Sequence, residues 1–123
     1  MPGQLPTIVV VEDDASMSQA LERILRAGGF EAVVFASAEA ALEAGAETAD
    51  CLVLDIRLPG MSGFELYRQL VHCGSEAPVI FVTAHDEPAL REEAERLGAS
   101  GFLPKPFAGR MLLDAVAQAL SSQ

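Results

Sequence analysis

Five short apolar runs recur along the chain, and their spacing constrains the fold more than any other feature. The runs are mostly β-branched or aromatic, are nearly continuous rather than alternating, and cover residues 7–11, 32–35, 51–54, 78–82 and 101–103. Continuous apolar runs of this length are typical of strands covered on both faces, as in a parallel sheet. We therefore expect five buried strands in one sheet.

Segments with helical periodicity follow each of these runs. In the first segment, Met17, Leu21, Ile24 and Leu25 form an apolar stripe, and Gly28-Gly29 supplies a left-handed end. A second helix is predicted after Ser37, with Ala41 and Leu42 facing inward, and a third from the capping box Ser62–Glu65 through Leu66 and Leu70 to Gly74. A fourth is predicted from a cap at Asp86 through Leu90, Ala94 and Leu97 to Gly98. A fifth is predicted over Leu112, Ala115, Val116 and Leu120. Five strand-helix repeats predict one doubly wound α/β domain over residues 1–123.

The charge of the chain limits its partners. The 123 residues carry 18 acidic and 8 basic side chains, a formal net charge of −10. Such a domain repels nucleic acid and anionic membranes, so we expect it to contact neither directly. The N-terminal segment has no basic region and only a short apolar run, which excludes a signal peptide and predicts a cytoplasmic protein. Cys51 and Cys73 form no metal-binding motif and are expected to be reduced, partly buried thiols.

Polar side chains stand where four of the five predicted strands end. They are Glu12, Asp13 and Asp14 after the first strand, Asp55 after the third, Thr83 after the fourth and Lys105 after the fifth. Ligands of open α/β sheets bind beyond the carboxyl ends of the strands. We therefore expect these side chains to converge at one edge, although Asp14 is better explained as a helix cap.

Charge repulsion indicates what this edge binds. Carboxylates about 5 Å apart repel by roughly 3 kcal/mol per pair at an effective dielectric near 20, so either their pKa values rise or a divalent cation neutralises them. Mg²⁺ suits Glu12, Asp13 and Asp55 and leaves room for phosphate oxygens. Lys105, the only lysine, and Thr83 could then bind a phosphoryl group. The pattern predicts a carboxylate nucleophile, Mg²⁺ and phosphoryl transfer.

Four motifs, in the order VVEDDASM, LVLDIRLPGMSG, VIFVTAHD and FLPKPF, resemble the receiver domain of two-component response regulators over essentially the whole chain. The resemblance is strongest to receivers that precede a helix-turn-helix DNA-binding domain, which implies transcription regulation. This chain could thus be the N-terminal domain of a longer regulator. The resemblance also implies a flavodoxin-like sheet with strand order 2-1-3-4-5 and five helices.

The resemblance assigns roles to the strand-end residues. Asp55 would accept a phosphoryl group from a sensor histidine kinase, with Mg²⁺ held by Glu12, Asp13, Asp55 and the backbone carbonyl of Arg57. Lys105 would bind the phosphoryl group, and the Lys105–Pro106 peptide bond is expected to be cis.

The resemblance also implies how a signal would leave the site. Thr83 would move toward the phosphoryl group, Phe102 would swing into the vacated space, and the face formed by the fourth helix, fifth strand and fifth helix would change. A phosphorylation-dependent homodimer is the expected output. The domain would be a phosphoacceptor that promotes its own phosphorylation and dephosphorylation rather than an enzyme with a separate substrate.

Several positions vary from the commonest receiver pattern. Glu12 stands where Asp is common, and its longer arm could place it one water away from the metal. Phe102 has no hydroxyl, so any switching must be steric. Without the resemblance to the family, Phe102 would be interpreted as an ordinary core residue. Arg57 and His85 each lie two residues past a site residue and are predicted to set the lifetime of the phosphorylated state.

Three other functions agree less well with the sequence than a phosphorylation switch does. An aspartate-nucleophile phosphatase would carry a second acid where this chain has Arg57. A flavin binder would need hydroxyls and backbone donors after the first strand, where EDDAS is acidic. A receiver that works without phosphorylation is disfavoured because all five residues of the site are present.

Overall fold

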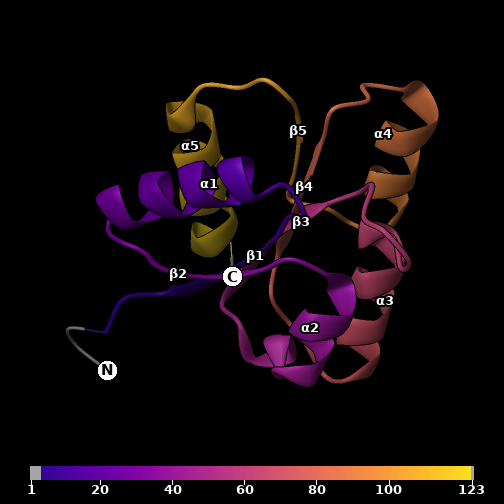
Figure 1. Ribbon diagram of the computed structural model, residues 1–123, viewed down its shortest axis with the longest axis horizontal. Coiled ribbons are helices and arrows are strands. Elements are labelled where there is room, and N and C mark those ends of the chain that lie inside the picture. The colour runs from indigo at the N-terminus through magenta and orange to yellow at the C-terminus, as the bar shows by residue number, and fades with distance from the viewer. Residues whose placement is uncertain (1–3, 123) are drawn as a thin grey trace.

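A five-stranded parallel sheet forms the centre of the molecule, with helices on both faces (Figure 1). The computed structural model describes residues 4–122, so residues 1–3 and 123 of the predicted domain lie outside the described part. The strands are β1 (Thr7–Val11), β2 (Glu31–Phe35), β3 (Cys51–Asp55), β4 (Val79–Thr83) and β5 (Gly101–Pro104). Their order in the sheet is β2-β1-β3-β4-β5, which confirms the predicted flavodoxin-like topology.

Two helical layers cover the sheet. The helices are α1 (Ala15–Ala27), α2 (Ala38–Glu43), α3 (Gly63–His72), α4 (Pro88–Arg96) and α5 (Gly109–Ser121), with a short 3-10 turn η1 at Ala46–Thr48. Helices α1 and α5 pack on one face, whereas α2, α3 and α4 pack on the other (Figure 1). None of the helices in the described part of the chain has both the length and the apolar character needed to cross a membrane.

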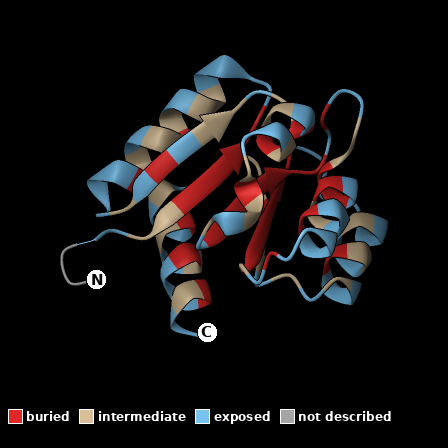
Figure 2. Cartoon of the chain, turned by 90° about the horizontal axis from the view of Figure 1, so that it is seen from below, coloured by how far each residue is buried: buried red, intermediate tan, exposed pale blue. Residues whose placement is uncertain are grey.

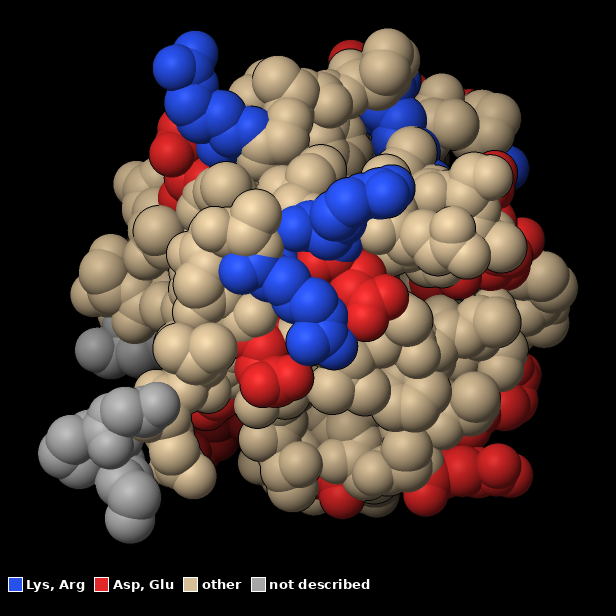
Figure 3. Space-filling view, turned by 60° about the vertical axis from the view of Figure 1, so that its left-hand side comes forward, with Lys and Arg blue, Asp and Glu red and all other residues tan. Residues whose placement is uncertain are grey.

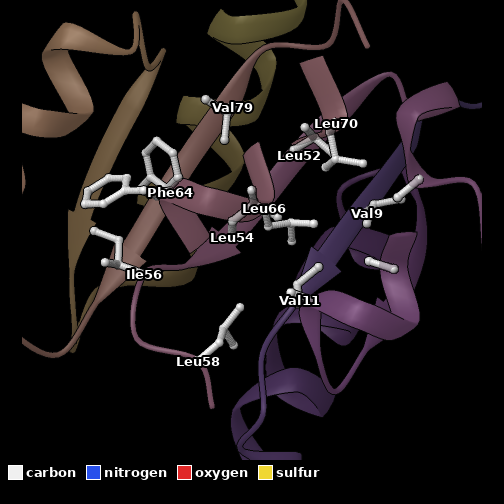
Figure 4. Close-up of a cluster of buried hydrophobic side chains, with 14 of the residues drawn as sticks. Val9, Val11, Leu52, Leu54, Ile56, Leu58, Phe64, Leu66, Leu70 and Val79 are labelled. Atoms are coloured by element: carbon white, nitrogen blue, oxygen red, sulfur yellow. The ribbon is translucent and has the colours of Figure 1, made fainter. Parts of the chain in front are cut away.

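Each face of the sheet has its own apolar core. Beneath α3, Leu52 and Leu54 of β3 pack against Leu66 and Leu70, all of them fully buried (Figure 4). The three central strands are buried along almost their whole length (Figure 2). These strands are therefore rigid supports for whatever side chains lie at their ends.

Strands β2 and β5 depart from the prediction that all five strands are covered on both faces. They lie at the two edges of the sheet, and only Ala32 of β2 and Leu103 of β5 are buried. Val33 remains 39% exposed. The run AVVF looks like the other strands, but edge position depends on strand order, which a local apolar run does not contain.

The predicted helix caps are confirmed with one exception. Asp14 caps α1 by accepting a hydrogen bond from the Met17 N–H at 3.1 Å, and Ser62 and Glu65 form the capping box of α3. The cap predicted at Asp86 is wrong, because α4 begins at Pro88 and Glu87 is its N-cap. Proline is favoured at the first helical position, since its φ is already helical and it has no N–H to satisfy there.

The two cysteines differ more than expected. Both are free, as predicted, and no disulfide joins them. Cys51 lies buried at the start of β3, where burial raises the pKa of its thiol to about 12. Cys73 is exposed at the end of α3 rather than partly buried. Cys51 is therefore an inert part of the core.

Candidate functional site

The carboxyl ends of β3, β4 and β5 lie side by side. Asp55 is the last residue of β3 and pairs with Val82, so Thr83 follows at the end of β4. Thr83 pairs in turn with Pro104, and the Lys105 N–H donates to the Thr83 carbonyl at 2.7 Å. The residues predicted to meet at one edge therefore come from adjacent strands.

Three carboxylates gather at this edge. One carboxylate oxygen from each of Glu12, Asp13 and Asp55 lies within 4.8 Å of the other two. Glu12 is 2% exposed and Asp55 is 5% exposed, whereas Asp13 is open to solvent. Two of the three acids are thus fixed in the protein, and the third faces the side from which a ligand would enter.

Lys105 places its ammonium between the two buried acids. Its Nζ donates to Glu12 Oε1 at 2.6 Å and to Asp55 Oδ2 at 3.3 Å. Repulsion in the cluster had been expected to require either raised pKa values or a divalent cation. The structure adds a third answer, because Lys105 itself supplies a counter-charge for Glu12 and Asp55.

This arrangement shifts the ionisation of both partners. Burial raises the pKa of Glu12 above its ordinary value of 4.5, and the Lys105 hydrogen bond only partly opposes that shift. For Lys105, burial lowers the pKa, but the hydrogen bond from its ammonium to Glu12 and the charge of Asp55 outweigh burial, so the pKa is raised. The lysine therefore stays charged at neutral pH.

The donor set of the cluster fits Mg²⁺. Carboxylate oxygens are the hard ligands that Mg²⁺ prefers, and one exposed acid leaves the site open to water and to phosphate oxygens. Asp14 is not part of the cluster, since its side chain caps α1. The Arg57 N–H donates to Asp55 Oδ1 at 3.2 Å, so the backbone of Arg57, whose carbonyl is the predicted metal ligand, lies next to the Asp55 carboxylate.

Glycines shape the backbone that follows Asp55. Gly60 has a φ of 75°, a left-handed conformation that glycine adopts without strain. Gly63 opens α3, and a β-carbon at this position would overlap the backbone carbonyl oxygen of Asp55. The motif LPGMSG thus lets the chain turn back and seat the first turn of α3 directly against the end of β3.

The two residues predicted to form the switch occupy different environments. Thr83 is fully buried, and its Oγ1 accepts a hydrogen bond from the His85 N–H at 3.0 Å. Phe102 on β5 is only half-buried, and the guanidinium of Arg91 lies 4.5 Å from the centroid of its ring. Phe102 therefore packs at the margin of the core and also contacts a charged side chain.

Two acids before α4, Asp86 and Glu87, make contacts that the sequence did not predict. Glu87 Oε2 lies 3.2 Å from the guanidinium of Arg57 and 3.9 Å from Nδ1 of His85, the two residues predicted to tune dephosphorylation. Asp86, predicted as a cap, instead pairs with Arg91 at 2.9 Å. Pro88 was the available signal, because a proline at the start of α4 leaves both acids in the loop before the helix.

Charges on the outer surface are mixed in sign. On the face shown in Figure 3, blue Lys and Arg side chains stand directly beside red Asp and Glu side chains. Among the described residues, Arg26 pairs with both Glu22 and Glu31. Its positive charge is therefore balanced locally by acids.

Comparisons with known proteins give a consistent result. Residues 8–117 match the response regulator receiver domain family. The chain is 42% identical over 113 residues to nodulation protein W of Bradyrhizobium diazoefficiens, covering 91% of this chain and 50% of that protein. It is 38% identical over 121 residues to the transcriptional regulatory protein FixJ of Azorhizobium caulinodans, covering 98% of this chain and 57% of that protein.

Solved structures agree with the sequence relatives. The response regulator StyR superposes with a TM-score of 0.87 at 43% identity, over 97% of this chain and 61% of that one. A structure described as the BeF3 activated DrrB receiver domain has a TM-score of 0.87 at 27% identity, over 96% and 99% of the two chains. The chain spans about half the length of the curated relatives it matches. It belongs to the receiver domain family of the response regulators of two-component systems.

Proposed function

We propose that this domain is a phosphorylation switch in which Asp55 accepts a phosphoryl group from the phosphohistidine of a sensor kinase. One observation supports this most strongly: the buried Asp55 carboxylate lies within 4.8 Å of two further acids and 3.3 Å from a lysine ammonium. No structural role requires four charges at one sheet edge. A site for an anionic phosphoryl group and its cation does require them.

The transfer itself needs little from the protein beyond position and charge. An Asp55 carboxylate oxygen attacks the phosphorus atom, a P–O bond forms, and the P–N bond to the donor imidazole breaks. The other carboxylate oxygen of Asp55 accepts a hydrogen bond from the Arg57 N–H, which orients the carboxylate. Mg²⁺ bound by Glu12, Asp13, Asp55 and the Arg57 carbonyl would supply charge neutralisation of the carboxylates and the phosphoryl oxygens.

Lys105 would exchange one partner for another during the reaction. Its ammonium now contacts Glu12 and Asp55, and it would turn to a phosphoryl oxygen once Asp55 is modified. A compact ammonium on a flexible stem suits such a point contact. The fully buried hydroxyl of Thr83, at the end of the neighbouring strand, would donate to another phosphoryl oxygen.

The signal would leave the site through Thr83 and Phe102. Inward movement of Thr83 frees space that the half-buried ring of Phe102 enters, and the face of α4, β5 and α5 changes. Met111 of α5, 49% exposed, offers apolar surface for a phosphorylation-dependent homodimer. A shift from 1:99 to 99:1 needs about 5.5 kcal/mol, which a few charge-assisted hydrogen bonds can supply.

We further propose that the domain is the receiver of a longer transcription regulator. Its curated relatives are about twice as long as the matched region, and one is named a transcriptional regulatory protein. The lifetime of the phosphorylated state would depend on Arg57 and His85, which Glu87 holds beside the site. Timing phosphate loss in an Arg57→Ala, His85→Ala variant checks this dependence; an unchanged rate removes it.

The proposal is tested by incubating the protein with Mg²⁺ and acetyl phosphate, then measuring intact mass and hydrodynamic size. We expect the wild type to gain one phosphoryl mass, and Asp55→Asn to gain none. Asp50→Asn is the matched control, since Asp50 directly precedes β3, at the end of that strand opposite to Asp55, and should leave the mass gain intact. Phosphorylation of Asp55→Asn, or none of the wild type, would contradict the proposal.

A further inference from the structure

A chain of contacts links the loop after β4 to the switch residue on β5 through helix α4. The guanidinium of Arg91 lies 4.5 Å from the centroid of the Phe102 ring, and its Nη2 donates to Asp86 Oδ1 at 2.9 Å. Asp86 lies in the loop after β4, Arg91 on α4 and Phe102 on β5. One side chain thus touches both the loop that leaves the site and the ring predicted to move.

The geometry makes Arg91 a restraint on Phe102. A guanidinium within about 6 Å of an aromatic centroid is attracted to the face of the ring. Asp86 limits the positions that the guanidinium can take, because Arg91 Nη2 forms an ion pair with Asp86 Oδ1. The ring packs against the core with only part of its surface, since Phe102 is half-buried, so the guanidinium contact adds to a packing that is itself incomplete.

We propose that Arg91 is a positioning residue of the switch, which holds the Phe102 ring in the half-buried orientation of this structure, taken as the resting one, and thereby couples the position of α4 to that of the ring. This inference rests on the proposed function. Inward rotation of Phe102 takes the ring away from the guanidinium, so the stacking contact favours the resting state. Loss of Arg91 should therefore shift the equilibrium toward the activated state.

Asp86 makes the restraint sensitive to the site. Asp86 follows Thr83 by three residues, and the intervening His85 is tied to Thr83 Oγ1 through its N–H at 3.0 Å. When the Thr83 hydroxyl moves toward a phosphoryl group, the hydrogen bond from the His85 N–H either breaks or moves with it. Either change displaces the loop that carries His85 and Asp86. The Asp86–Arg91 pair would loosen in the same movement, releasing the ring when Thr83 makes room for it.

Arg96 provides a control on the same helix. It is an exposed arginine of α4, and it pairs with Glu93 at 2.7 Å as Arg91 pairs with Asp86. The single arginine–aromatic stack found in the described residues involves Arg91 and not Arg96. A general effect of removing positive charge from α4 would appear equally in Arg91→Ala and Arg96→Ala, whereas the proposed restraint is specific to Arg91.

The test measures the affinity for beryllium trifluoride, the group that activates the matched DrrB receiver, by calorimetry at saturating Mg²⁺. Arg91→Ala should bind it about threefold more tightly, because the apparent affinity scales with the population of the competent state. Arg96→Ala should bind as the wild type does. In a Phe102→Leu background, Arg91→Ala should have no further effect. An unchanged or weaker affinity of Arg91→Ala would overturn the inference.

A second measurement needs no metal and no phosphoryl mimic. In metal-free protein carrying ¹³C-labelled phenylalanine, NMR reports the side-chain orientations of Phe102. We expect Arg91→Ala to raise the inward population and Arg96→Ala to leave it unchanged; equal populations in all three proteins would contradict the restraint. If the wild type bound no beryllium trifluoride, the proposed function would fail, while this measurement would still decide the role of Arg91.

Discussion

Helices α3 and α4 are neighbours on one face of the sheet, yet they are held in different ways. Helix α3 buries Phe64, Leu66 and Leu70 and begins with a complete capping box. The Phe64 ring also meets Phe81 of β4 edge-to-face, with centroids 4.8 Å apart. Helix α4 buries only Ala94, and its N-cap makes no side-chain hydrogen bond. The core fixes α3, whereas α4 rests on the surface.

Ion pairs replace burial along α4. Glu93 pairs with Arg68 of α3 and with Arg96, while Arg57 pairs with Glu87 at the start of the helix. Exposed pairs of this kind contribute about 0–1 kcal/mol each, far less than a buried leucine. Elements with few buried contacts open and shift at low cost. The candidate site therefore lies on the rigid centre, and we propose that the response to phosphorylation involves the less firmly held α4.

The largest expected effect comes from removing a buried side chain of α3. Leu70→Ala should lower the free energy of unfolding by about 3 kcal/mol, because a fully buried leucine leaves a cavity. Leu90→Ala, the matched change in α4, should cost about 1 kcal/mol, since Leu90 is only partly buried. Urea unfolding measures both values. Equal losses would show that α4 is held as firmly as α3.

Removing the ammonium of Lys105 tests the rigid site itself. Lys105→Met should lower the free energy of unfolding by about 2 kcal/mol at neutral pH in chelator, because Glu12 and Asp55 then lie buried without a counter-charge. Added Mg²⁺ should restore much of this loss. Arg23→Met, an exposed change on α1, is the control. A variant as stable as the wild type would mean that the lysine does not neutralise the cluster.

The next effect is the pH dependence of the free energy of unfolding that comes from the titration of Glu12, and its sign can be predicted. Burial raises the pKa of Glu12 in the folded protein above the ordinary 4.5, so the folded state binds a proton at a pH where the unfolded chain has lost it. Stability therefore falls as pH rises through this window. Relative to Glu12→Gln, the metal-free wild type should lose free energy of unfolding from about pH 4.5 upward. The opposite trend would contradict the raised pKa.

The smallest effect concerns an ion pair that joins the two helices. Arg68→Ala removes the contact between α3 and Glu93 of α4 and should change the free energy of unfolding by no more than about 0.5 kcal/mol. Hydrogen exchange should nonetheless quicken in α4 and stay unchanged in α3. Slower exchange in α4, or a larger loss of stability, would show that the surface pairs do more than we infer.

Local patterns in the sequence predicted the rigid part of the molecule well. The central strands carry unbroken apolar runs because both faces are covered, and the residue after each run marks the carboxyl end. The sequence therefore predicts that Asp55 and Thr83 lie at one edge, just after their strands, and in the structure each is the last residue of its strand. The edge position of β2 could not be predicted, because strand order is a long-range property.

Side-chain pairing between distant elements could not be predicted either. Lys105 was expected near Asp55, but its 2.6 Å contact with Glu12 joins residues 93 positions apart. The stacking of Arg91 on Phe102 depends on how α4 rests on the sheet, and the helix has little apolar pattern to fix that orientation. The features that could not be predicted from the sequence lie mainly on and around α4, where burial contributes least to stability.

Hydrogen exchange with and without beryllium trifluoride, at saturating Mg²⁺, tests most directly whether a phosphoryl group on Asp55 moves α4 and leaves α3 in place. We predict that amides of α4 and β5 change their protection when the mimic is added, while the interior amides of α3 do not, and that Asp55→Asn shows no change in either. Equal changes in α3 and α4, or a response that persists in Asp55→Asn, would contradict the account.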